Sequence, residues 1–161
     1  MIVHAGLIAA FFPGGWRGVL ISGESGVGKS DLALRCLDDG FRLVADDRTL
    51  VWACEGDLYG RAPDSLAGLM EVRGLGVLAE PALGYCRIAL AIRCGPMERI
   101  PEPALENYVG LNVPALSLAP LESSAPAKLR RALQHLGAGP EGAYQDALAA
   151  GVSPRPGGDS R

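Results

Sequence analysis

The sequence has few cysteines, few histidines and no long apolar run, and each shortage excludes a class of protein. Its four cysteines, Cys36, Cys54, Cys86 and Cys94, form no C-x-x-C pair, and only two histidines could join them as metal ligands. Neither a zinc site nor a disulfide framework is therefore indicated, and reduced, partly buried thiols are the simpler interpretation. No apolar stretch approaches the roughly 20 residues that a membrane-spanning helix needs. We therefore expect a cytoplasmic protein.

Basic segments are also lacking, at the N-terminus and elsewhere. Residues 1–12 are apolar but have no basic start, and the stretch breaks at Pro13-Gly14-Gly15, so it reads as neither a signal peptide nor a membrane span. The net charge is −3 and no basic block occurs, so composition gives no support to nucleic acid or an anionic membrane as a partner.

The length and composition favour one packed domain. The chain has 161 residues, of which 48% are hydrophobic, which is enough for one core and too little for two. We predict a domain over residues 1–136 and a C-terminal extension over residues 137–161. The last eight residues, 154–161, have almost nothing to bury and are expected to be disordered.

The most informative motif fits G-x-x-x-x-G-K-S, the phosphate-binding loop of nucleotide-binding proteins. Its glycines let backbone N–H groups turn inward around phosphates, and the following helix N-terminus adds its dipole. Lys29 is expected to reach the β- and γ-phosphates and Ser30 a Mg²⁺ ion; the alternative is a plain glycine-rich turn. The predicted nucleotide-binding residues are Gly23, Glu24, Ser25, Gly26, Val27, Gly28, Lys29 and Ser30.

Hydrophobic periodicity around this loop predicts an α/β fold. A strand over residues 2–12 and a buried strand over 18–22 lead into the loop, and a helix over 29–37 follows it. A strand over 42–45 comes next. Further strands are predicted over 49–53, 58–61, 70–78, 87–94 and 113–118, with a helical turn over 65–69 and a helix over 127–136.

Two adjacent carboxylates, Asp46 and Asp47, end the predicted strand over residues 42–45. Ligands bind at the carboxyl ends of strands in open α/β sheets, where the phosphate loop also lies. One carboxylate can then support Mg²⁺ while the other, for which we choose Asp47, accepts a proton from an attacking hydroxyl. The alternative is a turn in which both aspartates cap backbone N–H groups.

Glu71 and Arg73 alternate along the predicted strand 70–78, so both side chains can point toward one site. Glu71 suits a metal and Arg73 a phosphoryl oxygen. Taken alone, the pair is as consistent with a solvated strand face as with a site.

Three segments together, 23–30, 42–47 and 71–77, resemble the catalytic C-terminal domain of HPr kinase/phosphorylase. That family phosphorylates a serine of HPr, the small phosphocarrier of the sugar phosphotransferase system, with ATP and Mg²⁺. The resemblance implies a mixed central sheet similar to the nucleotide-binding domain of phosphoenolpyruvate carboxykinase. It also implies a short form without the family's N-terminal domain, and a hexamer.

The resemblance also implies roles for single residues. It assigns ATP to the phosphate loop, Mg²⁺ to Ser30 and Glu71 with support from Asp46, and the serine proton to Asp47. The other active-site positions it implies are His4, Lys29, Arg73 and Arg99. His4 could instead be packed on an apolar strand, and Arg99 could be a solvated surface residue.

One departure concerns the reverse reaction, in which phosphate attacks phosphoserine. Residues 121–126 replace the basic, glycine-containing loop that the family associates with dephosphorylation. We therefore expect kinase activity first, with phosphorylase activity weak or absent. A nucleotide-binding sensor or scaffold without efficient transfer is the alternative, and a small-molecule kinase or GTPase is a third reading that the segment 71–77 opposes.

Overall fold

The structure is a computed structural model of the chain, and it describes residues 1–136. The expected disorder of residues 154–161 lies outside the described residues. The elements of the described part are β1 (Ile2–Val3), β2 (Gly6–Phe12), β3 (Gly15–Ser22), α1 (Lys29–Asp38), β4 (Arg42–Ala45), β5 (Thr49–Cys54), β6 (Asp57–Arg61), η1 (Asp64–Leu66), β7 (Leu69–Val72), β8 (Gly76–Ala79), β9 (Cys86–Cys94), β10 (Ala104–Tyr108), β11 (Leu111–Leu118) and α2 (Ala125–His135).

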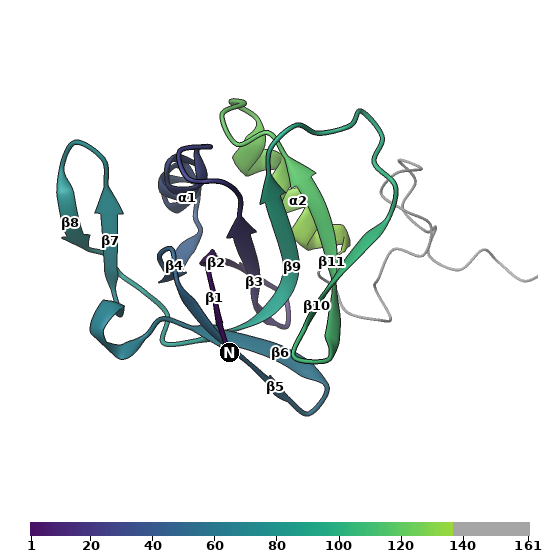
Figure 1. Cartoon of the computed structure of the whole chain (residues 1–161), viewed down its shortest axis with the longest axis horizontal. Coiled ribbons are helices and arrows are strands. Elements are labelled where there is room, and N and C mark those ends of the chain that lie inside the picture. The colour runs from purple at the N-terminus through teal and green to yellow at the C-terminus, as the bar shows by residue number, and fades with distance from the viewer. Residues whose placement is uncertain (137–161) are drawn as a thin grey trace, which may run out of the picture.

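The strands form a mixed sheet, as the predicted α/β class requires (Figure 1). β3, β9 and β11 run parallel to one another, and β2 lies between β3 and β4 and is antiparallel to both. The amino-terminal end of β9 pairs with β6, so the β1–β5–β6 strands continue the sheet on that side. β7 and β8 form a separate hairpin.

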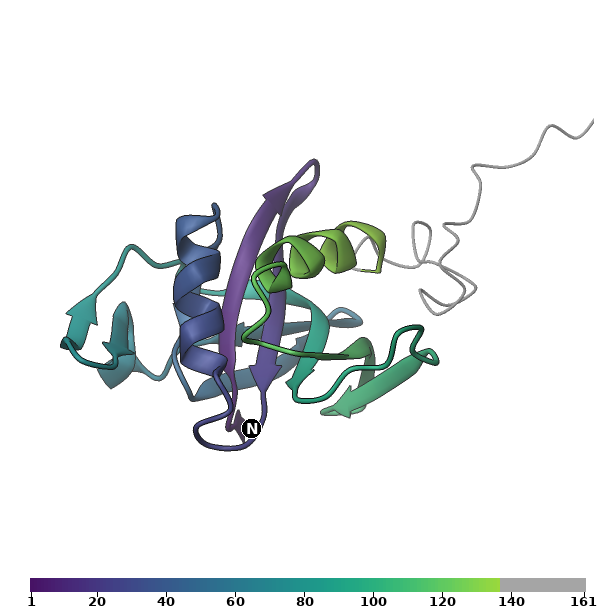
Figure 2. The same cartoon turned by 90° about the horizontal axis from the view of Figure 1, so that it is seen from above.

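Both helices cover one face of the sheet, as Figure 2 shows from above. Leu32 and Cys36 of α1 and Leu129 and Leu133 of α2 are fully buried there. Because these positions recur at helical spacing, each helix presents one apolar stripe to the strands. In residues 1–136, neither helix is long and apolar enough to cross a membrane.

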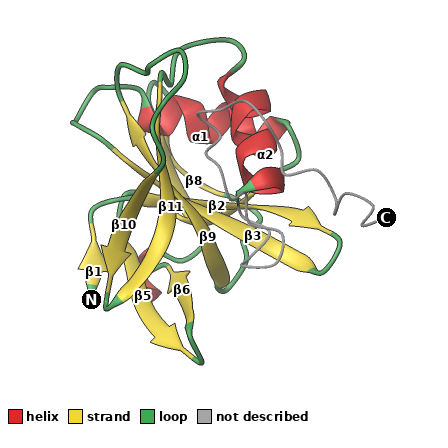
Figure 3. Ribbon diagram, turned by 90° about the vertical axis from the view of Figure 1, so that its right-hand side faces the viewer, coloured by secondary structure: helices red, strands yellow, loops and turns green. Residues whose placement is uncertain are grey.

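A second apolar cluster fills the other face of the sheet. Figure 3 shows the β5–β6 hairpin on the side away from the helices, and Leu58 and Val51 of this hairpin pack there against Leu7 and Leu20. Alternate residues of β2 and β3 therefore face two different cores. Such two-sided burial explains why these strands read as continuous apolar runs in the sequence.

The prediction of one continuous strand over residues 2–12 is wrong, because the strand is interrupted at His4. The chain bends there and divides into β1, which pairs with β5, and β2, which pairs with β3 and β4. The bend keeps the His4 side chain out of both cores, with 70% of it exposed. The reading of His4 as a packed core histidine is thus excluded.

The single strand predicted over residues 70–78 is also wrong, because the chain reverses within it. β7 and β8 are antiparallel, with Glu71 opposite Val77. Gly74 and Gly76 have φ angles of 89° and 110°, which glycine adopts without steric cost, so they permit the reversal. Alternation alone could not reveal this turn. Two further strands, β1 and β10, were not predicted separately.

Gly18 offers a test of how closely β3 packs against β9. A Cβ atom at Gly18 would lie 2.5 Å from Cys86 Sγ and 2.8 Å from the Arg87 carbonyl oxygen. Since the carbonyl belongs to a paired strand and cannot move away alone, we expect Gly18→Ala to lower the free energy of unfolding by about 1–3 kcal/mol. Urea denaturation measures this change.

Gly84→Ala is the matched control, because a Cβ there meets nothing within 4 Å and its φ is not positive. It should stay within about 0.5 kcal/mol of the wild type. Equal stability of the two variants would contradict the packing described for β3.

Candidate active site

The predicted phosphate loop connects β3 to α1. Gly23, Gly26 and Gly28 have φ angles of 147°, 80° and 114°, which disfavour other residues, so the motif's glycines are needed by the backbone path. The Leu32 N–H donates to the Gly28 carbonyl at 2.9 Å and begins the helical hydrogen bonding. The backbone N–H groups of the loop therefore lie next to a helix N-terminus, a position that favours the binding of an anion.

Lys29 lies at the mouth of this loop. Its Nζ donates to the carbonyl oxygens of Gly23 at 2.7 Å and Glu24 at 3.0 Å. An ammonium group has three N–H donors, so one remains for a phosphate oxygen. The lysine is thus held where it can neutralise a phosphate bound by the loop.

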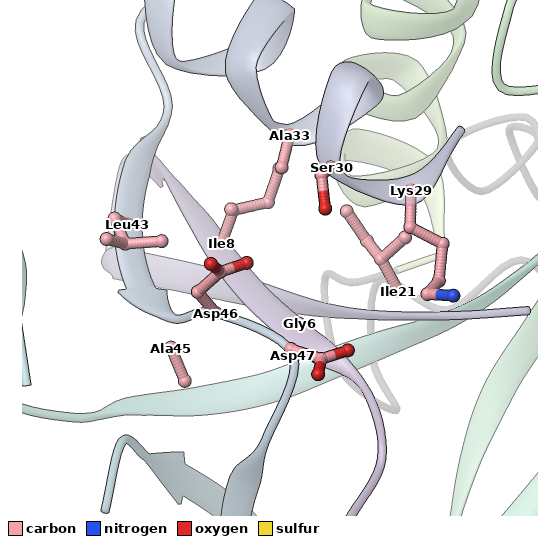
Figure 4. Close-up of a pocket in the computed structure, with 10 residues that line it drawn as sticks. All are labelled: Gly6, Ile8, Ile21, Lys29, Ser30, Ala33, Leu43, Ala45, Asp46 and Asp47. Carbon is pink, nitrogen blue, oxygen red and sulfur yellow. The ribbon is translucent and has the colours of Figure 1, made fainter. Parts of the chain in front are cut away.

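Asp46 and Asp47 follow β4 at the sheet edge where the phosphate loop leaves β3. Figure 4 shows a small pocket at this edge. Lys29 and Ser30 line it on the side of α1, and the two aspartates line it at the end of β4. The predicted meeting of a phosphate loop and a carboxylate pair is therefore found in the structure. Apolar side chains, among them Ile21, form much of the remaining wall.

Asp46 links the end of β4 to the β7–β8 hairpin. Its Oδ2 accepts the backbone N–H of Glu71 at 2.9 Å. Burial raises the pKa of Asp46, the hydrogen bond from Glu71 opposes this rise, and the negative charges of Asp47 and Glu71 add to it. Three carboxylates therefore act on one another here, which suits the binding of a cation.

Asp47 pairs with His4, the residue at the bend between β1 and β2. His4 Nε2 lies 3.0 Å from Asp47 Oδ1, and the two side chains are 70% and 56% exposed. Asp47 has a φ of 65°, a left-handed conformation that aspartate tolerates better than most residues. One carboxylate oxygen is thus engaged by His4, and the other can accept a proton.

The remaining predicted site residues lie outside the pocket walls. Arg73 is exposed in the turn between β7 and β8, and not on one strand face with Glu71, because β7 ends at Val72. Arg99 is exposed in the loop between β9 and β10. Their roles stay predictions that rest on the family resemblance.

The oxygen donors fit a nucleotide-bound Mg²⁺ ion. Within residues 1–136, no three or more histidine, cysteine, aspartate or glutamate side chains form a metal site of their own. Mg²⁺ bound with a nucleotide usually takes only one or two carboxylates, with phosphate oxygens and water completing its shell. The hydroxyl of Ser30 and the carboxylate of Asp46 border the same pocket and suit that mode.

Gly6 borders the site but was not predicted from the sequence. It lines the pocket, pairs with Ile21, and a Cβ added to it would lie 3.8 Å from the Asp47 backbone nitrogen. No motif marks this glycine. Only the pairing of β2 with both β3 and β4 places it between the phosphate loop and the aspartates.

A comparison with family models matches the part of the chain that carries this site. The family model described as HPr Serine kinase C-terminal domain matches residues 2–84, which include the phosphate loop, the aspartate pair and Glu71. The chain belongs to the HPr serine kinase C-terminal domain family.

Relatives of this family are similar over the same part of the chain. The HPr kinase/phosphorylase of Clostridium tetani (strain Massachusetts / E88) is 50% identical over 66 residues, which are 41% of this chain and 22% of that protein. The HPr kinase/phosphorylase of Clostridium perfringens (strain SM101 / Type A) is 48% identical over 66 residues, with the same two shares. The aligned part thus spans about a fifth of the length of these curated relatives.

A solved structure supports the fold. The structure of the Hpr(Ser) kinase/phosphatase from Coxiella burnetii aligns with a TM-score of 0.71 and 24% sequence identity, covering 83% of this chain and 88% of that one. The likeness extends well beyond the family-model match. It shows that the mixed-sheet α/β architecture is shared.

The raised pKa of Asp46 predicts a pH-dependent stability. The folded state binds a proton on the Asp46 carboxylate more tightly than the unfolded chain does. The contribution of this protonation to the free energy of unfolding is therefore fully present below the ordinary aspartate pKa of about 3.9. It is lost as the pH rises through the raised value. Asp46→Asn keeps an oxygen for the Glu71 N–H but removes the charge. We therefore expect Asp46→Asn to be more stable than the wild type at neutral pH, in urea denaturation without metal or nucleotide.

The stability difference between Asp46→Asn and the wild type should shrink as the pH falls toward about 3.9. Asp57→Asn, at the exposed first residue of β6, controls for the loss of one negative charge. A difference for Asp46→Asn that did not vary with pH would contradict the effect of burial on this carboxylate.

Proposed function

We propose that this chain binds ATP and Mg²⁺ at the phosphate loop and transfers the γ-phosphoryl group to a serine of HPr. The observation that carries the proposal is the pocket between Lys29 and Ser30 on one side and Asp46 and Asp47 on the other. Phosphoryl transfer requires phosphate charge to be neutralised next to a group that handles the proton of the acceptor. Family membership supports HPr as the acceptor.

The phosphate loop and the carboxylates near it neutralise the phosphate charge and bind the metal. Its backbone N–H groups and the Lys29 ammonium group stabilise negative charge on the transferring phosphoryl group. Ser30, Asp46 and Glu71 would hold Mg²⁺, which would supply further positive charge to the phosphates. Arg73 is assigned to a phosphoryl oxygen, and Arg99 is a further active-site position by family resemblance.

Asp47 and His4 act on the serine hydroxyl that accepts the phosphoryl group. His4 occupies one carboxylate oxygen of Asp47 at 3.0 Å, which orients the other oxygen toward an incoming hydroxyl. Asp47 accepts the proton of the serine hydroxyl as that oxygen bonds to the γ-phosphorus, and the bond from this phosphorus to the β–γ bridging oxygen breaks to release ADP. His4 is thereby a positioning residue, since it acts through Asp47.

The forward reaction is favoured over phosphorolysis by the loop before α2. Leu121 lies against Gly28 of the phosphate loop. It belongs to the segment 121–126, which by the family resemblance replaces a basic loop associated with the reverse reaction. A leucine offers no charge to a second phosphate. We therefore assign kinase activity to this chain and little phosphorylase activity.

Several finer properties follow from the family resemblance and belong to the same proposal. Residues 1–136 form the catalytic domain, and its nucleotide-binding architecture is that of phosphoenolpyruvate carboxykinase. The protein works in the cytoplasm as a hexamer, regulating carbohydrate metabolism. Neither nucleic acid nor a membrane is a partner.

The test is incubation of the purified chain with HPr, Mg²⁺ and ATP, followed by intact-mass and fragment analysis. We expect one phosphate on a serine of HPr. Asp47→Asn should still bind ATP but should transfer phosphate at least ~10²-fold more slowly, because a general base usually contributes that much.

Asp57→Asn, at the exposed first residue of β6, is the matched control and should transfer at the wild-type rate. A transfer rate for Asp47→Asn within about threefold of the wild type would remove Asp47 as the base. Bound ATP without any phosphoserine from the wild type would favour a sensor or scaffold over a kinase.

Lys29→Ala tests the phosphate loop directly. Removing the ammonium group should weaken ATP binding in calorimetry by about tenfold or more and abolish detectable transfer. Arg131→Ala removes a cation from the exposed side of α2 and should change neither quantity. Unchanged ATP affinity in Lys29→Ala would rule out the phosphate-loop assignment.

A further inference from the structure

The segment 119–124, which connects β11 to α2, passes against the phosphate loop. If Gly28 carried a Cβ atom, that atom would lie 2.9 Å from Leu121 Cδ2 and 3.3 Å from Pro120 Cγ. The side chains of these two residues therefore occupy the space beside Gly28, the last glycine of the loop. They limit how far the loop backbone can move there.

The backbone conformation of Gly28 determines how the loop joins α1. Gly28 immediately precedes the helix and has a φ angle of 114°. The N–H groups of the following residues, Lys29 and Ser30, are among the first of the helix and have no partner within it. They are free to bind an anion only if Gly28 keeps the helix start in place. A contact that holds Gly28 thus helps to hold the phosphate-binding N–H groups.

Arg35 of α1 holds the backbone on both sides of Leu121. Its Nη2 group donates to the Pro120 carbonyl, and its Nη1 group donates to the Glu122 carbonyl at 3.1 Å. Leu121 itself is 69% exposed, so burial of its apolar surface stabilises its position only weakly. Hydrogen bonds from a charged donor are stronger than those between neutral groups. The guanidinium group is therefore the main attachment of Leu121 to the helix.

Asp31 orients the Arg35 guanidinium group. Arg35 Nε donates to Asp31 Oδ2 at 2.9 Å, one helical turn earlier, and only 30% of the arginine side chain is exposed. Because the guanidinium group is planar, a bond at Nε fixes the direction of both Nη groups. Asp31 directly follows Ser30, the last residue of the phosphate-loop motif. The link from the motif through Arg35 and back to Gly28 is therefore closed.

We propose that Arg35 is a positioning residue of the phosphate loop. The inference rests on the proposed function, in which the loop binds the phosphates of ATP. Arg35 acts through the segment 120–122, which it holds against Gly28, and it does not contact the nucleotide. The affinity of the loop for phosphate thus depends on an arginine that lies outside the motif 23–30.

The experiment measures the binding of ATP and of inorganic tripolyphosphate, both with Mg²⁺, by calorimetry. Arg35→Met keeps an apolar stem and a good helix former but removes every hydrogen-bond donor. We expect it to weaken both ligands by roughly fivefold or more, because both bind through their phosphates. In the transfer assay, the KM for ATP should rise by a similar factor while kcat stays within about twofold, since Asp47 and His4 are not disturbed.

Arg130→Met is the matched control. Arg130 of α2 donates to the Asp39 carbonyl at 2.6 Å, so it also joins a guanidinium group to a backbone carbonyl, but at the end of α1 far from the phosphate loop. Both variants should lower the free energy of unfolding, whereas only Arg35→Met should weaken phosphate binding. The affinities are compared at a temperature at which circular dichroism shows all proteins folded.

A double-mutant cycle tests whether Arg35 acts through Leu121. Leu121→Ala removes the leucine contact with Gly28 and should also weaken tripolyphosphate. The combined variant should bind tripolyphosphate within about twofold of Arg35→Met alone, because the second change removes a contact that is already lost. Two losses that multiply would show independent effects and would contradict this path.

The outcomes separate this inference from the proposed function. If the wild type binds neither ligand, the phosphate-loop function fails, and the role of Arg35 fails with it. If the wild type binds both ligands and Arg35→Met binds them equally well, Arg35 is not a positioning residue while the phosphate loop stands. An equal loss of affinity in Arg130→Met would attribute the effect to general loosening of the helices and would also overturn the inference.

Discussion

One constraint of strand pairing underlies the whole site: β2 lies between β3 and β4 and is antiparallel to both. β3 and β4 therefore point the same way, so the phosphate loop and the aspartate pair leave the sheet at one edge. Burial fixes this register, because Leu7 and Ile8 are fully buried in different cores and a one-residue slip would exchange them. The groups that we propose to be catalytic meet because hydrophobic packing aligns the strands that carry them.

The same edge concentrates features that do not favour stability. Burial and two neighbouring carboxylates oppose ionisation of Asp46, and Asp47 adopts a left-handed backbone conformation. Such local violations of folding preference are typical of functional sites. A cation would offset the carboxylate charge, and the phosphate loop with Lys29 favours an anion beside it, so the site suits a ligand that supplies both.

The sequence predicts what depends on short-range pattern. The phosphate-loop motif, α1 and β4 each carry their own local signal, in the glycines, the helical spacing and the run 42–45. The structure confirms the helix and the strand, and it gives Gly23, Gly26 and Gly28 positive φ angles. Features that depend on distant contacts were not predictable. The bend at His4 exists because β1 pairs with β5, the turn after Glu71 was masked by continued alternation, and Leu121 meets Gly28 only in the folded chain.

A crystal structure of the chain with Mg²⁺ and a non-hydrolysable ATP analogue would test the proposed site most directly. We expect the phosphates within the loop 23–30, the terminal phosphate between Lys29 Nζ and the Asp47 carboxylate, and Mg²⁺ beside Ser30 and Asp46. The contradicting result would be a triphosphate bound elsewhere, or a terminal phosphate turned away from Asp47 with no room for a serine hydroxyl between them.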